Sequence, residues 1–155
     1  MTGTELTRVL DHEHVAYERI PHSHTDTARQ EATELHLAQD EVAKTIVLVG
    51  QHGYVRASLP ASERLDLHKV RELLGCGEDT HLATESELAG AYPMFELGAV
   101  PPFGGPTGDW AVLDRRLAHR ESVVLEAGVH DESVRIRTHD LIRLADPQIA
   151  DICQE

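Results

Sequence analysis

One of the few lysines in this sequence stands where it can take part in chemistry. The chain has twelve arginines but only two lysines, and one of these, Lys44, opens the apolar run that continues to Val49. With the two-residue period of a strand, Lys44 shares a face with Ile46 and Leu48. Its ammonium then either reaches solvent at the strand end or lies at the mouth of an apolar pocket, where a compact point charge serves a chemical purpose.

A second candidate is the stretch at 92–108, which holds four of the seven prolines, four of the eleven glycines and three of the six aromatics. A structureless stretch of this length inside a compact domain is usually functional. Gly98 lets the backbone approach a ligand closely, and Pro101 and Pro102 fix the turn that follows. Main-chain groups held in this way can polarise a reacting carbonyl. The alternative interpretation is a rigid structural connection.

The eleven histidines raise the question of a metal site. The densest groups are Asp11-His12-Glu13-His14 and His22-Ser23-His24, and neither has the i, i+4 spacing of a helical zinc motif. We therefore expect surface histidines and no metal. His130 follows Gly128 in a turn between two strands, from which its side chain is either exposed or reaches a pocket. No nucleophile elbow, phosphate-binding loop or dinucleotide fingerprint is present.

The elements that must position these residues alternate between strands and helices. The pattern predicts an α/β (α+β) fold in a single domain, 1–155, whose mixed, mostly antiparallel sheet is surrounded by helices. Hydrophobic periodicity predicts strands at 15–20, 42–49, 54–59, 80–83, 110–113, 122–126 and 134–137. It predicts helices at 4–13, 26–38, 65–74, 85–89 and 138–145, followed by a tail after Pro147.

The composition limits the partners and the compartment. The net charge is −13, from 14 basic and 27 acidic residues, which argues against broad coating of a polyanion such as DNA. An RNA partner must therefore be held locally. Cys76 and Cys153 are far apart and in no metal-ligand spacing, which indicates a reducing compartment. We see no signal peptide or membrane span, so the expected location is cytoplasmic, without membrane association.

Several of these features, in this order, resemble the YbaK/ProX family of aminoacyl-tRNA deacylases, which is related to the editing insertion of bacterial prolyl-tRNA synthetases. The most specific parts are Lys44 after Ala43 and the Gly-x-x-x-Pro spacing of Gly98 and Pro102. The resemblance covers nearly the whole chain. It includes Leu59-Pro60, Val112-Leu113-Asp114, Ala127-Gly128 and Asp140-Leu141.

The resemblance implies hydrolysis of the ester that joins an amino acid to the terminal adenosine of a tRNA, without metal or organic cofactor. Lys44 would bind phosphate or ribose oxygens of that nucleotide, and the main chain at Gly98 would orient the ester and the attacking water. The other residues that the resemblance assigns to substrate binding are Ala99, Val100, Pro101, Pro102, Phe103 and His130. An aminoacyl ester is already activated, so positioning and polarisation suffice without a protein nucleophile.

The predicted function is therefore trans-editing of a tRNA mischarged with alanine, cysteine or serine. Its partners would be the acceptor end of the aminoacyl-tRNA and a synthetase that delivers it. Pro101 departs from the family pattern, because many members have a serine or threonine before the loop proline. This departure and the acidity of the chain leave two alternatives. One is a non-catalytic module that binds an aminoacyl or nucleotide ligand or a partner protein, and the other is a hydrolase of some non-tRNA ester or amide.

Overall fold

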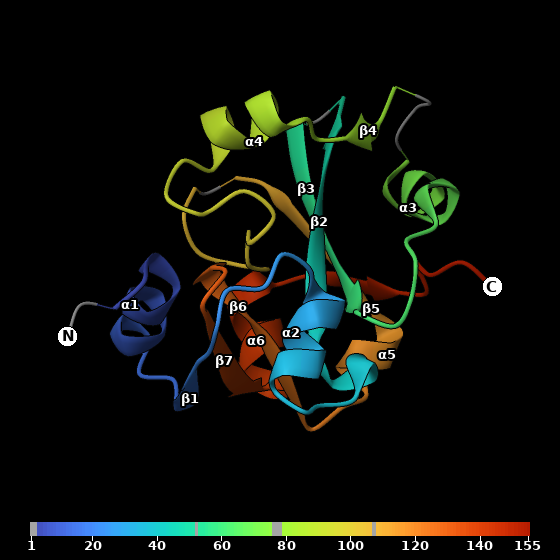
Figure 1. Cartoon of the computed structure of the whole chain (residues 1–155). Coiled ribbons are helices and arrows are strands. Elements are labelled where there is room, and N and C mark those ends of the chain that lie inside the picture. The colour runs from blue at the N-terminus through green and yellow to red at the C-terminus, as the bar shows by residue number, and fades with distance from the viewer. Residues whose placement is uncertain (1–2, 52, 76–78, 107) are drawn as a thin grey trace.

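The strands are arranged in two sheets, as the computed structural model of residues 3–51, 53–75, 79–106 and 108–155 shows (Figure 1). The three-stranded sheet has the order β1-β7-β6, and the five-stranded sheet has the order β4-β2-β3-β5-β8. Their bounds are β1 Tyr17–Pro21, β2 Ala43–Gly50, β3 Gly53–Pro60, β4 His81–Leu82, β5 Trp110–Asp114, β6 Ser122–Val129, β7 Glu132–Arg137 and β8 Gln148–Ala150.

The strand pairings confirm the predicted mixed, mostly antiparallel arrangement. The pairs β1–β7, β6–β7, β2–β3 and β2–β4 are antiparallel, whereas β3–β5 and β5–β8 are parallel. A bridge between Val42 and Val124 joins the start of β2 to β6, so the two sheets meet there. The start of β2, in the five-stranded sheet, therefore lies against β6 of the three-stranded sheet. The candidate site lies near this junction.

Helices surround the sheets, and their ends follow capping rules. They are α1 Glu5–His12, α2 Ala28–Glu34, α3 Leu67–Leu74, α4 Glu85–Ala91, α5 Arg115–Ala118 and α6 Thr138–Ala145, with a short 3₁₀ turn at Gln39–Glu41. The Asp66 carboxylate accepts from the first amides of α3, and Gly75 ends this helix in the left-handed region. Thr84 and Glu87 form a capping box at the start of α4.

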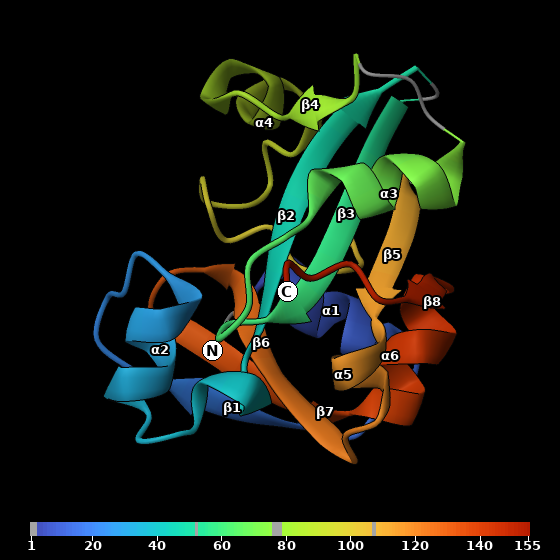
Figure 2. The ribbon, with the colours of Figure 1, turned by 90° about the vertical axis from the view of Figure 1, so that its right-hand side faces the viewer.

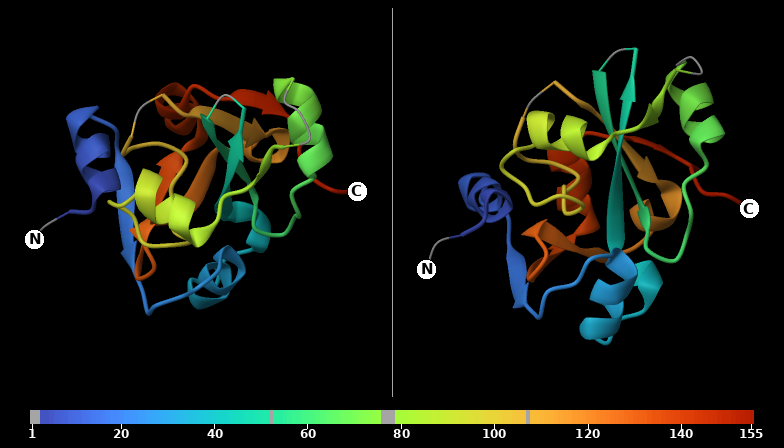
Figure 3. Two further views of the ribbon diagram at one scale, coloured as in Figure 1. Left: turned by 90° about the horizontal axis from the view of Figure 1, so that it is seen from above. Right: turned by 45° about the horizontal axis from the view of Figure 1, so that its top comes forward.

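The apolar core is divided between the two sheets. One cluster joins α1, β6, β7 and α6 through residues such as Leu10, Leu125 and Leu141. A second cluster joins the five-stranded sheet to α3 through Leu48, Leu59 and Val70. Figure 2 shows α3 across β2 and β3, with α5 and α6 beside the lower end of β5. The segment after α4 lies between α1 and the β2–β3 hairpin in both views of Figure 3.

The predicted elements are found, but one helix is shorter, β6 is longer and three short elements are added. The helix predicted at 26–38 ends at Glu34, because His36 adopts a positive φ of 56° and the Leu37 amide donates back to the Ala32 carbonyl. Three elements were not expected, the 3₁₀ turn at Gln39–Glu41, the short helix α5 and strand β8 in the supposed tail. His52 and Cys76 lie outside the described residues. None of the described helices is both long and apolar enough to cross a membrane.

Candidate functional site

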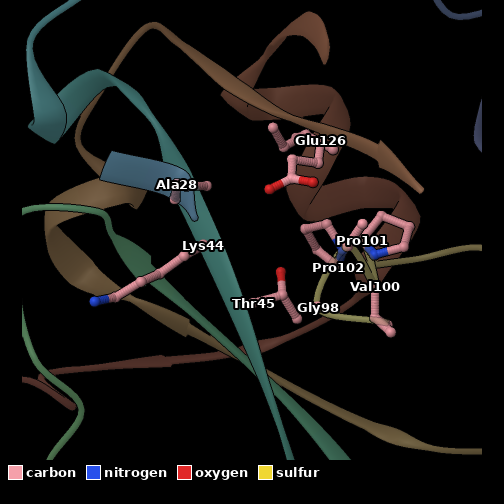
Figure 4. A pocket seen from close by; sticks show the side chains of 11 residues that line it. Ala28, Lys44, Thr45, Gly98, Val100, Pro101, Pro102 and Glu126 are labelled. Atoms are coloured by element: carbon pink, nitrogen blue, oxygen red, sulfur yellow. The ribbon is translucent and has the colours of Figure 1, made fainter. Parts of the chain in front are cut away.

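A narrow cleft opens where the start of β2, the end of β6 and the proline-rich segment meet (Figure 4). Its volume is about 40 Å³. Most of the residues that line it are small or apolar. The polar groups that face it come from the side chains of Glu126 and Thr45 and from the main chain. The lining residues are Ala28, Ala43, Lys44, Thr45, Gly98, Ala99, Val100, Pro101, Pro102, Leu125 and Glu126.

The wall formed by residues 98–102, which we call the glycine loop, begins at a residue that requires glycine. Gly98 has a φ of +82°, which side chains other than glycine adopt only with strain. The Ala99 amide donates to the Glu96 carbonyl at 3.0 Å and closes a tight turn over this residue. The amides of Gly98 and Val100 have no acceptor among the described residues. Two main-chain donors of the loop are thus not used by any of the described residues.

A buried arginine holds the far end of the glycine loop in place. Arg56 of β3 is 2% exposed, and its guanidinium donates to the carbonyl oxygens of Pro101 at 2.9 Å and Gly104 at 2.6 Å. Its charge is balanced by Asp109, at 2.6 Å, which also accepts from the Tyr92 hydroxyl at 2.7 Å. Burial and this neighbouring carboxylate raise the pKa of Tyr92, so its hydroxyl stays a donor. The loop is therefore preorganised rather than loose.

A β-bulge shapes the opposite wall. The register of β6 against β7 shifts between Glu126 and Val129, and Gly128 within the bulge has a φ of +88°. A Cβ at Gly128 would lie 2.6 Å from the Phe95 ring, so only glycine fits there. The Gly128 carbonyl also accepts from the Glu96 amide at 2.9 Å. Bulges often re-aim side chains at functional sites, and this one directs Glu126 into the cleft (Figure 4).

His130 lies behind the glycine loop, as a support for it. The ring is buried, and its Nε2 lies 2.5 Å from the Leu97 carbonyl oxygen, directly before Gly98. A Cβ built on Gly98 would be 3.5 Å from the imidazole, which is ordinary contact distance. The His130 amide donates to the Glu96 carboxylate at 3.2 Å, and its Nδ1 lies 3.0 Å from Glu126 Oε2. His130 thus connects the two walls of the cleft.

Glu126 is a site residue that the sequence analysis did not identify. It is 8% exposed, yet no hydrogen bond to its carboxyl group is present among the described residues. Burial raises its pKa to about 9, and the carboxylates of Glu31, Glu96 and Asp26 add to the shift. The sequence signal was weak but real: a single acid ends the apolar run of 122–126 immediately before a glycine bulge. A buried acid in a cleft with a displaced pKa is a typical sign of a functional site.

Lys44 lines the cleft, but its ammonium points away from the glycine loop. Figure 4 shows Lys44 and Thr45 leaving β2 on opposite sides, as the alternation of a strand requires. Burial lowers the pKa of Lys44, and the nearby charges of Arg29 and Arg64 lower it further. No acceptor for the ammonium is present among the described residues. Lys44, Arg29 and Arg64 therefore form a local group of cations beside the cleft, and the Glu63 carboxylate, which raises the pKa of Lys44, offsets part of their charge.

Residues 22–144 match the family model of the aminoacyl-tRNA editing domain. The chain belongs to this family. A relative of the editing domain is the multifunctional Ser/Thr-tRNA deacylase ProXp-y of Escherichia coli K12, 32% identical over 104 residues. That alignment covers 64% of this chain and 59% of the relative, and the O157:H7 form matches equally. The match thus leaves about two fifths of the curated relatives unaligned.

Solved structures share the fold of this editing domain. A protein proposed to be a trans-editing enzyme for prolyl-tRNA synthetase superimposes with a TM-score of 0.84, at 27% identity and full coverage of both chains. The hypothetical protein APE2540 superimposes with a TM-score of 0.87 over 97% of this chain and 99% of its own, at 21% identity. The family assignment and the mixed α/β fold that the sequence resemblance implied are thereby confirmed.

The cleft of the editing domain brings together most of the predicted site residues. Lys44 and the glycine loop, including Ala99, Val100, Pro101 and Pro102, line it. Phe103 does not line the cleft; it is 4% exposed and packs in the core cluster of α1, β6 and β7. His130 contributes contacts behind the wall instead of surface within the cleft. The roles assigned to all these residues stay predictions.

One group in the part of the chain that the structure describes has spacing suited to a metal ion, and it contains no histidine. Asp114, Asp151 and Cys153 place their ligand atoms within 4.8 Å of one another. Both carboxylates are already bonded to Arg116, and Asp151 also accepts from Lys69 at 3.0 Å. Burial raises the pKa of the Cys153 thiol to about 12, so the thiolate form that a metal needs is disfavoured. This group fits a structural ion-pair network.

Proposed function

We propose that this chain hydrolyses the ester bond of tRNAs mischarged with a small amino acid: alanine, cysteine or serine. The observation that carries the proposal is the cleft itself. It is small, about 40 Å³, and three of its lining residues, Ala28, Ala43 and Ala99, have only a methyl side chain. A pocket of this size and lining suits a short aminoacyl side chain beside a reacting ester. Pocket size alone discriminates by about 1–3 kcal/mol per methylene, so related small amino acids compete.

The glycine loop would bind the ester. The unbonded amides of Gly98 and Val100 are suited to the carbonyl oxygen, whose negative charge grows when water attacks. The arginine that holds Pro101 and the histidine that holds Leu97 fix the loop in advance, so little reorganisation is needed during the reaction. Because the ester is activated, preorganised donors and a positioned water are enough for hydrolysis.

Lys44 would bind the terminal nucleotide from outside the cleft. Its ammonium lies beside Arg29 and Arg64, on the side of β2 away from the glycine loop. In the substrate the phosphate of the terminal adenosine also lies away from the aminoacyl ester, across the ribose. A local group of cations answers the objection that a chain with a net charge of −13 repels RNA. The acceptor end is held at one point, while the rest of the surface stays acidic.

The relatives support the same class of reaction. The E. coli relative is a deacylase of Ser- and Thr-tRNA, and the structural neighbour is proposed to edit for prolyl-tRNA synthetase. We extend deacylation to this chain, and we propose the acceptor end of aminoacyl-tRNA as its partner, presented free or by a synthetase in the cytoplasm.

A deacylation panel tests the proposal. The purified chain is incubated with tRNAs charged with alanine, cysteine, serine, threonine and a large amino acid as control, and the release of free amino acid is measured. We expect release of at least one small amino acid at a rate well above spontaneous hydrolysis. Saturable binding of charged tRNA without any release would instead favour a non-catalytic module, to which the proline at position 101 also points. Release from small aminoacyl esters with no preference for a tRNA carrier would indicate a different substrate.

A further inference from the structure

The carboxyl group of Glu126 is placed like a ligand-binding group. Its side chain leaves the bulge of β6 and points into the cleft, toward the side of β2 that carries Thr45 (Figure 4). It is 8% exposed, and none of the described arginines or lysines forms an ion pair with it. Leaving a buried carboxyl without a partner is costly, and such a group in a native structure calls for an explanation. A bound ligand would supply the missing partner.

The contact with His130 leaves one oxygen of Glu126 for this ligand. The imidazole Nε2 is 2.5 Å from the Leu97 carbonyl, so this nitrogen must carry a proton and donate it. In the neutral ring Nδ1 is then an acceptor, and Glu126 Oε2 lies 3.0 Å from it. A carboxyl proton donated from Oε2 to Nδ1 would satisfy these two atoms, which have no other partner among the described residues. The other oxygen, Oε1, has no donor among the described residues.

The surroundings of the carboxyl group favour a cation as its ligand. Asp26, Glu31 and Glu96 are the charged neighbours that act on Glu126, and all three are acids. The ammonium of Lys44 points away from this part of the cleft and does not compete (Figure 4). A neutral hydroxyl would gain little from a negative environment, whereas an ammonium gains from every one of these charges.

We propose that Glu126 binds the α-ammonium group of the aminoacyl ester and so selects aminoacyl ends over other acylated tRNA ends. This inference rests on the proposed function of the same cleft. In an aminoacyl ester the α-carbon that carries the ammonium is bonded directly to the ester carbonyl carbon. If the amides of the glycine loop hold the carbonyl oxygen, the ammonium therefore lies within the same small cavity. There it faces the wall that carries Glu126. Glu126 is thus a specificity-determining residue.

The test compares two esters that differ at one group. One is the aminoacyl-tRNA that the chain hydrolyses best, and the other is the matching α-hydroxyacyl-tRNA, in which a hydroxyl replaces the ammonium. We expect wild type to prefer the aminoacyl ester by about 10- to 100-fold in kcat/KM, the range for a hydrogen bond to a charged group. A bound ammonium favours the ionised form of Glu126, and Glu126→Gln keeps the shape but cannot ionise. It should lower kcat/KM for the aminoacyl ester by a similar factor and change that of the hydroxyacyl ester less than about threefold.

Two controls make the comparison specific. Glu132→Gln removes a carboxyl of the same 8% exposure on β7, which neither lines the cleft nor belongs to the acids that act on Glu126, and it should keep the preference for the aminoacyl ester. Glu126→Asp keeps a carboxyl that can ionise but withdraws it by one methylene, and it should retain part of the preference. Thermal melting of each variant reports whether it is folded. The preference of wild type for the aminoacyl ester is measured on the unaltered chain, so it does not depend on the folding of any variant.

The outcomes separate this inference from the proposed function. The inference is overturned if Glu126→Gln keeps the wild-type preference or loses activity equally on both esters. It is also overturned if the variant loses activity only on esters with a hydroxylated side chain. If wild type hydrolyses nothing in the panel, the proposed function fails, and the inference is tested by binding. The probes are then stable 3′-amide analogues of aminoacyl- and hydroxyacyl-adenosine. Tighter binding of the ammonium analogue, lost in Glu126→Gln, supports the role of Glu126; equal binding of the two analogues overturns it.

Discussion

Arg56 Nη1 donates a hydrogen bond of 2.9 Å to the carbonyl oxygen of Pro101, and so connects the middle of β3 to the wall of the cleft. The same guanidinium bonds Gly104 and the Asp109 carboxylate. A planar group with several donors can hold these acceptors at once, whereas an ammonium cannot hold them in the same geometry. The shape of the glycine loop therefore depends on a residue that does not line the cleft.

Replacement of Arg56 should damage both the fold and the cleft. Arg56→Ala leaves the Asp109 carboxylate without its buried partner and should cost about 3–5 kcal/mol of unfolding free energy. Arg56→Lys keeps the charge but loses the planar set of donors that binds several acceptors at once. We therefore expect a smaller loss of stability and at least a tenfold lower kcat/KM. Urea denaturation and the deacylation assay measure the two effects. Arg19→Lys, at the Glu132 ion pair in the other sheet, is the matched control and should retain activity. Full activity in Arg56→Lys would contradict a positioning role.

Gly98→Ala tests the backbone of the loop. A left-handed conformation costs an alanine about 1–2 kcal/mol, and the added methyl meets His130 only at 3.5 Å, so the change strains the backbone without a clash. We expect a destabilisation of this size together with a loss of activity, since relaxation of φ moves the Gly98 amide. Gly75→Ala, at φ +66° on the end of α3, should cost similar stability and leave activity intact. Equal activity of the two variants would show that the loop conformation does not matter for hydrolysis.

Lys44→Ala should abolish most activity while the protein stays folded. Its ammonium is partly desolvated and has no acceptor among the described residues, so its loss should not lower the unfolding free energy. If it binds a phosphate, the slope of log KM against log salt concentration should fall by about 0.7. Lys69 is the chain's other lysine and bonds Asp151 and the Cys153 carbonyl. Lys69→Ala should therefore reduce stability but not activity. An active Lys44→Ala with an unchanged salt slope would remove this lysine from the mechanism.

The sequence was most informative where one strong local pattern determines the structure. The apolar run of β2 pointed to Lys44, and the density of proline and glycine after Tyr92 pointed to Gly98. Both residues line the cleft, each on its own wall. The periodic pattern of 65–74 likewise predicted the end of α3, which Gly75 caps. In each case neighbouring residues contain the whole signal, because period and backbone preference are local properties.

Long-range contacts could not be predicted in this way. Strand β8 exists because Ile149 pairs in parallel with Leu113 of β5, and a tail after a proline gives no local sign of such a partner. Phe103 was expected to contact substrate, but it packs into the core, since an aromatic residue in a loop is compatible with either position. Glu126 was missed for the related reason that its burial depends on a bulge, whose Gly128 packs against Phe95 more than thirty residues earlier.

The buried acids predict a stability that falls as pH rises. The folded pKa of Glu126 is about 9 and that of Glu31 about 7, whereas both titrate near 4.5 when unfolded. Between those values the folded protein keeps protons that the unfolded chain has lost, so the free energy of unfolding decreases with rising pH. The lowered pKa of Asp151 acts in the opposite direction, but only below about pH 4.

Glu126→Gln should therefore remove most of the decline between about pH 7 and pH 9, and Glu31→Gln only the part between about pH 4.5 and pH 7. Urea denaturation across this range measures both. The groups that face Glu126, which are the carboxyl groups of Asp26, Glu31 and Glu96 and the imidazole of His130, remain in the Gln variant, so the difference from wild type isolates the one carboxyl. We expect Glu126→Gln to be more stable than wild type at about pH 9. Parallel curves of unfolding free energy against pH for the two proteins would mean that Glu126 ionises at its ordinary pH. The cleft would then contain more water than the 8% exposure of Glu126 implies.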